Sequence, residues 1–432
     1  MGQEHRGRHI LRGERRQREV ELEITREARD DLFRDYARIV SEAHVRELES
    51  RGHDFIESKA QGPYVWDTDG NQYIDCNSSA SIFNLGRRHP EILARLRDGM
   101  YDTDQGNFPM ISREKAALAK MLADFVPGAL ECSVFSVVRG EAFDFACKLA
   151  RGYTGRKELL GVEGSWFGQT GFAVSLSERE DKRDFGPLIP GTRVCRYNDL
   201  NAARRSISLQ TAAVILELVQ AENHCRGADR SYLSGLRNIC CENGALLVVD
   251  ETQTGMGRTG KRFAFEHYGV EPDVVIIGES LGAGVFPIAA TVFTQKVNAF
   301  MNEHPLIHLS TFGGADLGCV VACKALQVYR QTRPWENAAS LGALLKAGIE
   351  KIVERYGGAI GSVAGLGLLL SLDLKSPGDA RTFCKKLARA GVLASTGAVA
   401  KQTVILRPSL TIARKDVDRI LESIEGAARG MG

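Results

Sequence analysis

The sequence has no long apolar run, no marked charge bias and no cysteine spacing that suits a metal. No stretch of about 18 apolar residues occurs, so no membrane span is expected. The net charge is +2, which gives no reason to expect nucleic acid or an anionic membrane as a partner. The basic opening "HRGRHILRGERRQRE" lacks an apolar segment, so it predicts a solvated or frayed arm and not a secretory signal. The ten cysteines are therefore expected to be free thiols of a cytoplasmic protein.

What is present is an ordinary globular composition on a long chain. With 44% hydrophobic and 25% charged residues, neither disorder nor a fibre is indicated. A chain of 432 residues leaves room for two domains. We expect an N-terminal arm and helix over residues 1–57, which belong to the small domain. A large domain is expected over 58–311, and a linking helix with the rest of the small domain over 312–432.

The order of the predicted elements indicates an α/β protein. A charged amphipathic helix is expected at about 29–50, followed by a hairpin at "GPYVWDTDGNQYID". From there to about Thr294, strands such as "AAVILEL", "ALLVVDE" and "DVVIIG" alternate with loops and helices. This alternation predicts a mostly parallel sheet wrapped by helices, with ligands beyond the carboxyl ends of its strands. After it, a long helix to about Tyr356 leads into a small α+β domain.

Three side chains stand where strands or glycine-rich loops reach that edge. Asp250 closes the buried run "ALLVVD", where an unpaired carboxylate is costly, so it should meet a cation. That cation is either Arg258, in a structural ion pair, or the protonated nitrogen of a heterocyclic ligand. Trp166, in "EGSWFGQT", either stacks on a planar ligand or fills the core. Glu279 follows the buried run "VVIIG" and precedes further glycines.

Taken together, these segments resemble a known family. The run "VVDETQTGMGRTGKRFAFEHYGVEPDVVIIGESLGAG" is similar to the signature of class III (omega) aminotransferases, fold-type I pyridoxal-phosphate enzymes of the glutamate-1-semialdehyde aminomutase type. "LGRRHPEI", "ELVQAE", "STFGG" and "PSLTI" match the family in the same order. The resemblance implies the fold-type I fold, with a large domain, a small α+β domain, and sites formed at a dimer interface.

The resemblance also implies roles for individual residues. Asp250 would pair with the pyridine nitrogen of the cofactor and keep it protonated, so that the ring acts as an electron sink. Gln253 would lie near the phenolic oxygen of the ring, and Trp166 would stack on the ring face. Thr311 would donate its hydroxyl to the cofactor phosphate of the neighbouring subunit. Glu222 would line the substrate side.

The sequence departs from the family at the residue that normally binds the cofactor covalently. Glu279 occupies the place of the Schiff-base lysine, and Lys261 and Lys296 belong to other segments. A carboxylate cannot form an imine, so a covalent bond to the cofactor is excluded at this position.

Two further departures concern the phosphate and the substrate. The family's Ser-Gly-Ala-Glu before a helix is replaced by Val138-Arg139-Gly140-Glu141. Backbone N–H groups at Gly140 and its neighbours would still attract an anion, and Arg139 would either contact the phosphate or fill its space. Ile405 stands where the family often has an arginine, so the carboxylate clamp is missing or shifted to Arg407.

Three functions remain open from the sequence. The preferred one is an enzyme of altered chemistry, which acts on a small amine, amino acid or keto compound and holds a B6 vitamer without a covalent bond. Its vitamer would be pyridoxamine phosphate sooner than pyridoxal phosphate, because the ammonium complements Glu279, which would act as general acid or base. One alternative is a cofactor-free or non-catalytic homologue, a partner subunit in a homodimer or heterodimer. The other is an ordinary pyridoxal-phosphate aminotransferase with its lysine replaced.

Overall fold

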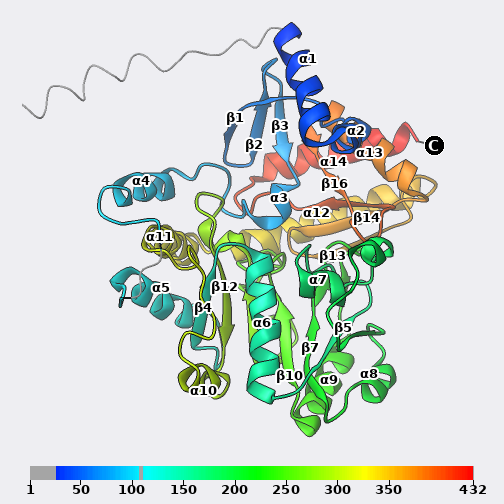
Figure 1. Ribbon diagram of the computed structural model, residues 1–432. Coiled ribbons are helices and arrows are strands. Elements are labelled where there is room, and N and C mark those ends of the chain that lie inside the picture. Colours follow the sequence, from blue (N-terminus) through cyan, green and yellow to red (C-terminus); the bar gives the residue numbers. More distant parts are fainter. Residues whose placement is uncertain (1–25, 107–109, 432) are drawn as a thin grey trace, which may run out of the picture.

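A seven-stranded sheet forms the centre of the protein (Figure 1). The computed structural model describes residues 26–106 and 110–431. The strand order is β4-β12-β11-β10-β7-β5-β6. The strands are β4 (Cys132–Ser136), β5 (Glu158–Val162), β6 (Thr192–Cys195), β7 (Thr211–Leu216), β10 (Leu246–Asp250), β11 (Val274–Ile277) and β12 (Ala289–Phe293). Only β12 runs antiparallel to its neighbours. The predicted mostly parallel α/β sheet is therefore confirmed.

Helices cover both faces of this sheet because its four central strands, β12, β11, β10 and β7, are fully buried and mostly apolar. One face packs on α6 (Arg139–Thr154), α7 (Gly171–Leu176) and α10 (Gln295–Glu303). The other face packs on α5 (Arg113–Ala123), α8 (Leu200–Ser206), α9 (Arg230–Asn243) and α11 (Asp316–Thr332), with α4 (Pro90–Gly99) next to α11. Short elements connect them: η4 (Glu180–Phe185), the hairpin β8 (Val219–Gln220) and β9 (Arg226–Gly227), η5 (Ala264–His267) and η6 (Glu279–Gly282).

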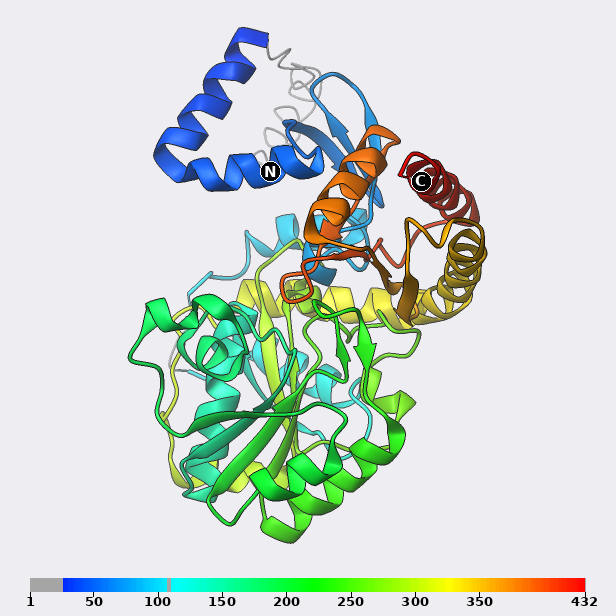
Figure 2. The same cartoon turned by 90° about the vertical axis from the view of Figure 1, so that its right-hand side faces the viewer.

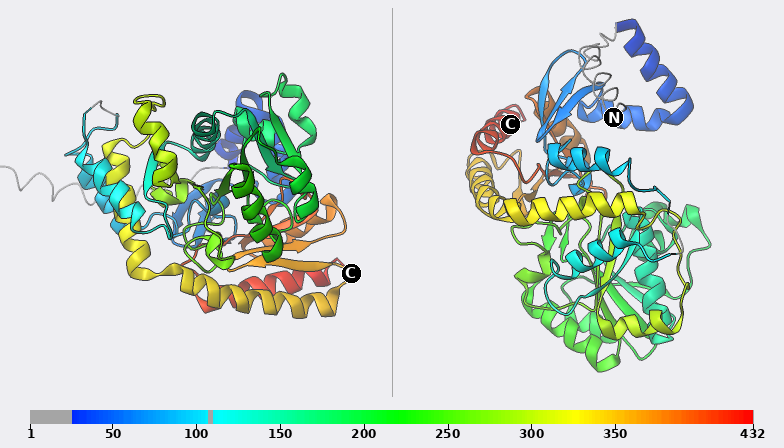
Figure 3. Two further views of the ribbon diagram at one scale, coloured as in Figure 1. Left: turned by 90° about the horizontal axis from the view of Figure 1, so that it is seen from below. Right: turned by 90° about the vertical axis from the view of Figure 1, so that its left-hand side faces the viewer.

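A second apolar core lies beyond the carboxyl edge of the large sheet. It holds the sheet β13-β14-β17-β16 and three helices, of which α14 lies beside α12 (Figure 3). The strands are β13 (Ser362–Leu366), β14 (Leu369–Asp373), β16 (Ser395–Thr396) and β17 (Thr403–Leu406). The helices are α12 (Pro334–Tyr356), α13 (Pro377–Arg389) and α14 (Arg414–Arg429). These elements match the small α+β unit that the C-terminal sequence pattern predicts.

The N-terminal segment also belongs beside this second core. Three successive helical segments, sharply bent at Ser41, project from the body (Figure 2): α1 (Arg26–Asp35), η3 (Tyr36–Ser41) and α2 (Glu42–Arg51). The expected basic arm lies outside the described residues. A further sheet follows, made of β1 (Glu57–Gln61), β2 (Tyr64–Asp67), β3 (Gln72–Asp75) and β15 (Val392–Leu393). No helix among the described residues is long and apolar enough to cross a membrane.

Three local features differ from the sequence-based expectation. The hairpin β2–β3 packs with β15 of the C-terminal segment, although it was expected in the large domain. The domain limits themselves remain a prediction. The helix expected to run to about Tyr356 is α12, and the preceding helix α11 was not predicted; the two are separated at Arg333, whose φ is +45°, and Pro334 starts α12. The strand β6, "TRVC", is short and only partly buried, and its pattern gave no signal.

Candidate active site

Three acidic residues meet at the carboxyl edge of the large sheet. Asp250 is the last residue of β10, Glu217 follows β7, and Glu279 begins η6 just after β11. Because β7, β10 and β11 are parallel neighbours, their carboxyl ends lie side by side. Glu217 was not predicted as a site residue. The signal that identified Asp250, a carboxylate closing a buried strand, applies equally to Glu217.

Asp250 is 1% exposed and has one oxygen without a hydrogen bond among the described residues. Its Oδ1 atom accepts a hydrogen bond from the Thr252 backbone N–H at 2.9 Å. Its Oδ2 atom lies 3.8 Å from Nη2 of Arg139, which is close enough for an ion pair but too long for a hydrogen bond. Burial raises the pKa of Asp250, and the Arg139 charge opposes this shift. Asp250 therefore still offers a buried acceptor to a cationic donor.

The alternative ion pair between Asp250 and Arg258 is wrong. Arg258 is fully buried and donates to Oδ1 of Asn84 at 2.6 Å. Its other hydrogen bonds go to the backbone carbonyls of Leu368, at 2.9 Å, and Pro408, at 2.5 Å. Burial lowers the pKa of Arg258 to about 9. Arg258 thus joins the large sheet to the C-terminal part of the chain and leaves Asp250 to Arg139.

Glu279 caps α6, the helix whose N-terminus would bind the cofactor phosphate according to the family resemblance. Its Oε1 atom accepts a hydrogen bond from the backbone N–H of Arg139, the first residue of α6, at 2.9 Å. The N-cap residue Val138 provides no side-chain cap, so this carboxylate takes that role. A negative charge at the N-terminus of a helix is favoured by the helix dipole. Glu279 therefore occupies a backbone N–H group that could otherwise donate a hydrogen bond to a phosphate.

The Arg139 side chain turns from the helix towards Asp250. Its Nη2 atom donates to the backbone carbonyl of Trp166 at 3.0 Å, besides the ion pair with Asp250. The next residue, Gly140, has no room for a side chain, because a Cβ atom there would lie 2.5 Å from Cγ2 of Thr170. Gly140 thus allows the first turn of α6 to approach the loop that carries Trp166 and Thr170.

Glu217 adds a second buried carboxyl group to this end of the site. Its Oε2 atom accepts a hydrogen bond from the Trp166 backbone N–H at 2.8 Å. Burial, followed by the charge of Asp250, raises the pKa of Glu217 well above its usual range. Glu217 is therefore protonated more readily than an exposed glutamate.

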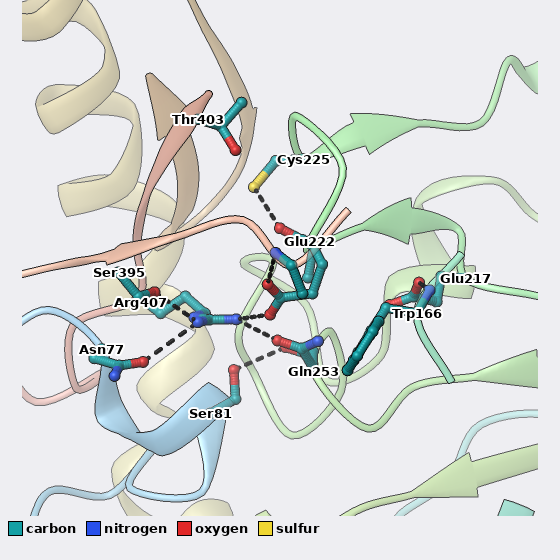
Figure 4. A network of polar contacts seen from close by, with 12 residues as sticks. Asn77, Ser81, Trp166, Glu217, Glu222, Cys225, Gln253, Ser395, Thr403 and Arg407 are labelled. Atoms are coloured by element: carbon teal, nitrogen blue, oxygen red, sulfur yellow. Dashed lines mark hydrogen bonds and ion pairs between the residues drawn. The ribbon is translucent and has the colours of Figure 1, made fainter. Parts of the chain in front are cut away.

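Arg407 forms a polar network on the other side of the site (Figure 4). Its Nη1 atom donates to Oε1 of Glu222 at 2.6 Å and to Oε1 of Gln253 at 2.5 Å. Its Nη2 atom donates to Oγ of Ser395 at 3.0 Å and to Oδ1 of Asn77 at 3.3 Å. Asn77 and Ser395 were not predicted, because neither lies in a motif that marks a substrate residue. The structure thus brings Glu222, Gln253 and Arg407 together.

The charges of this network balance. Burial alone would raise the pKa of the Glu222 carboxyl, but the Arg407 charge and its hydrogen bonds bring this pKa below the ordinary value. Glu222 also accepts the Ala398 backbone N–H at 3.0 Å through Oε2. Ile405, by contrast, is fully buried in β17 among apolar side chains. The arginine at this side of the site is therefore Arg407, and Ile405 belongs to the apolar core.

Trp166 borders a cavity of about 510 Å³. This cavity lies between the loop after β5 and the loop 398–402, and Arg179, Lys401 and Gln402 also line it. The Arg179 guanidinium lies 5.1 Å from the centre of the Trp166 ring, at cation–π distance. Trp166 is half-buried and is not a core tryptophan.

Thr311 does not join the other predicted residues within one chain. It is exposed and lies in the turn before α11. Large apolar side chains around it are exposed as well, among them Leu309 at 72% and Phe312 at 56%. Leu309 shares a groove of about 470 Å³ with Met110 and Ile111, and Ile111 is 99% exposed. An apolar surface of this kind is typical of a protein–protein contact.

The residues fit a B6 vitamer at one end only. The free oxygen of Asp250 and the unbonded Nε2 atom of Gln253 are buried polar atoms that suit a polar ring. At the other end, Glu279 occupies the donor of α6 and brings a negative charge to the phosphate position. Arg139 already supplies a cation to Asp250. In this arrangement the side chains do not fit the phosphate end of pyridoxal phosphate, while at the ring end Arg139 lies 3.8 Å from the Asp250 oxygen that the ring nitrogen would use.

Comparisons with known proteins agree on one family. The family model described as "Aminotransferase class-III" matches residues 48–428. The chain is 36% identical to an uncharacterized aminotransferase of Archaeoglobus fulgidus over 93% of this chain and 95% of that protein. It is 34% identical to a putrescine aminotransferase of Pectobacterium atrosepticum over 87% and 83%. The solved ornithine aminotransferase of Toxoplasma gondii superimposes with a TM-score of 0.86, at 26% identity and 93% and 95% coverage.

Proposed function

The chain belongs to the class-III aminotransferase family, and we propose from this premise that it is an enzyme of altered chemistry. Class-III aminotransferases use pyridoxal phosphate, and their homologues act on small amines or amino acids. The single observation that carries the proposal is the hydrogen bond between Glu279 and the N-terminus of α6. A carboxylate in this position caps α6 without a bound phosphate. It cannot form a covalent bond with an aldehyde.

The two lysines that flank Glu279 in the sequence do not take over the missing function. That residue 279 corresponds to the family's lysine position is part of the proposal. Lys261 donates to the backbone carbonyl of Glu266 at 2.8 Å, and Lys296 is exposed on α10. A B6 vitamer would therefore be held without a covalent bond, and its charged groups would have to displace the contacts of Arg139 and Glu279.

The substrate side of the site supports recognition of a small polar molecule. Arg407 and Glu222 present one positive and one negative charge, and Gln253 adds an amide. A substrate carboxylate would have to compete with Glu222 for Arg407, while a substrate ammonium would find Glu222 already paired. We propose that an amine, amino acid or keto compound enters through the cavity beside Trp166, whose lining residue Ala398 contacts Glu222.

A second candidate is an ordinary aminotransferase. Its support is that the relatives described above are all named aminotransferases. The comparisons by themselves favour this candidate over the altered chemistry, which depends on Glu279 and Arg139 alone. A partner subunit without its own cofactor is a further possibility that the internal contacts of Arg139 and Glu279 support.

We expect ordinary transamination to be absent. With pyridoxal phosphate present and alanine or glutamate as the amino donor, the purified protein should release no keto acid above background. The reason is that no residue supplies both an amine for exchange and a proton carrier. An Asp250→Asn variant, purified in parallel, serves as the control for contaminating enzymes. Turnover by the wild type that this variant loses would establish the ordinary aminotransferase.

Pyridoxamine phosphate should bind more tightly than pyridoxal phosphate. Both vitamers carry a phosphate that meets Glu279, but only the amine form has an ammonium with which this carboxylate can pair. A net pairing of about 1.4 kcal/mol corresponds to a tenfold difference in affinity. Equilibrium dialysis of both vitamers measures it, and Glu279→Gln should remove most of the preference. Equal affinities that this substitution leaves unchanged would show that the carboxylate only caps α6.

The protein should form a dimer through the surface around Thr311. Sedimentation should give a dimer at micromolar concentration, because the exposed apolar groove would otherwise face water. Ile111→Asp should dissociate it, since the charge would lie in the contact. Leu209→Asp is the matched control, because Leu209 is 68% exposed and does not line that groove. A wild-type monomer would contradict the shared site, unless a different subunit restores the dimer.

A further inference from the structure

A second cleft, of about 640 Å³, lies where the two apolar cores of the protein meet. One side is formed by the hairpin β8–β9 and the start of α9, and the other by α12 and β13. Figure 1 shows β13 at the border between these two parts of the chain. The residues that matter here are His224, Arg226, Arg230, Tyr268, Lys346 and Leu366. None of them belongs to the site around Asp250 and Arg407.

The charged side chains that line this cleft are basic, and the carboxylates of Asp229 and Glu266 lie outside the lining but near enough to act on Tyr268 and His267. Arg226, Arg230 and Lys346 line it, and no carboxylate does. Within the described part of the chain, none of these three side chains forms an ion pair. Lys346 is half-buried, and its ammonium donates to the Gly365 carbonyl at the long distance of 3.4 Å. Like charges that converge on a concave surface attract anions strongly.

The backbone and the remaining walls add to this attraction. Arg230 is the first residue of α9, a helix of 14 residues whose N-cap, Asp229, makes no side-chain cap. The positive end of the helix dipole therefore points to the region of the cleft. Tyr268, Val363 and Leu366 supply an aromatic and apolar wall. The volume lies within the range of sites for small organic ligands.

The two histidines of the cleft do not change its sign. His224 pairs with Asp373, their Nδ1 and Oδ1 atoms being 3.4 Å apart, so this acidic group is already engaged behind the wall. Burial, followed by the charge of Lys261, lowers the pKa of His267, which is expected to be neutral. The fixed charges of the two arginines and the lysine therefore determine what binds.

We propose that this cleft binds a small organic anion with at least two negative charges and a flat or apolar body. Phosphate or carboxylate groups would contact Arg226, Arg230 and Lys346, and the body would pack on Tyr268 and Leu366. Such a ligand joins the part of the chain that contains α9 to the part that contains α12. Because the segment 222–228 also carries Glu222, an anion at Arg226 can bias the Glu222–Arg407 network. The site is independent of the chemistry at Glu279.

Titration calorimetry with 1-naphthyl phosphate and with inorganic pyrophosphate tests this proposal. Both probes should bind to the wild-type dimer or monomer at low ionic strength. Lys346→Met and Arg226→Gln should each weaken binding about tenfold, which corresponds to the loss of one charge-assisted contact of about 1.4 kcal/mol. Lys351→Met is the matched control, because Lys351 lies exposed on the same helix and does not line the cleft.

Each outcome decides for or against the site. A loss of affinity in both cleft variants, with no change in the Lys351→Met control, supports it. Arg226→Gln changes an exposed side chain, so its result holds even if Lys346→Met folds poorly. No binding by the wild type at millimolar probe overturns the proposal. Equal binding by wild type and both cleft variants overturns it too, because the attraction would then belong to the general surface.

Discussion

The double variant Arg139→Ser/Glu279→Lys should capture pyridoxal phosphate covalently, whereas the wild type should not. The introduced lysine provides the amine. Because the Glu279 carboxylate is then absent, the backbone N–H of residue 139 at the start of α6 becomes available to the phosphate. The serine at residue 139 removes the guanidinium from Asp250. Reduction with borohydride followed by intact-mass measurement detects the covalent adduct.

The single variants should show why both changes are needed. Glu279→Lys alone leaves the Arg139 guanidinium beside Asp250, so the ring nitrogen of the cofactor meets a cation. Arg139→Ser alone leaves Asp250 without a positive partner, and Glu279 remains in place and cannot form an imine. In each single variant the cofactor would lack one charge-assisted hydrogen bond, which is worth about 1.5–3 kcal/mol, or roughly ten- to more than a hundredfold in affinity. The apparent affinity of the double variant should exceed that of Glu279→Lys by at least the lower figure.

Two results would contradict this account. Equal capture by Glu279→Lys and by the double variant would mean that Arg139 does not occupy the ring-nitrogen position. No capture by the double variant, with the fold intact by circular dichroism, would mean that residue 279 is not the family's lysine position. The first result removes only the role of Arg139, and the second removes the proposed function.

The sequence predicted the residues of the site better than their mutual contacts. Asp250 was identifiable because a carboxylate at the end of a buried strand must meet a cation, and Glu279 because it follows a buried strand and matches the family's lysine in the resemblance. The partner of Asp250 was not identifiable. Arg258 is closer in sequence, but its guanidinium is satisfied by Asn84 and two carbonyls that the folded chain brings from distant segments. Arg139 reaches Asp250 only because the folded chain places the N-terminus of α6 near the carboxyl end of β10.

The fold shows the same limit. Buried β-branched runs identified most strands of the large sheet, because a parallel strand is apolar on both faces. The short pairing of β3 with β15, such as Ile74 with Val392, joins residues more than 300 positions apart and leaves no local pattern. The network of Arg407 likewise depends on Asn77 and Ser395, which come from opposite ends of the chain. Local propensity cannot predict contacts of this kind.

Arg407→Leu should destabilise the protein strongly at pH 8 and much less at pH 5. Arg407 is 3% exposed and is the partner that holds the Glu222 carboxylate in its ionised form. Removing one partner of a buried ion pair costs about 3–5 kcal/mol, because the other charge remains buried and unpaired. Thermal unfolding at both pH values measures the effect.

The direction of the pH dependence is the decisive part of this prediction. In the wild type, the pKa of Glu222 is below its unfolded value, so its contribution to stability is present above about pH 4.5 and is lost as the pH falls. Without Arg407, burial raises this pKa, so the variant loses stability as the pH rises from about 4.5. The double variant Glu222→Gln/Arg407→Leu should recover much of the loss at pH 8, because no buried charge remains. If Arg407→Leu were equally unstable at both pH values, Arg407 would act through packing and hydrogen bonds, and the charge balance of the substrate side would have to be reconsidered.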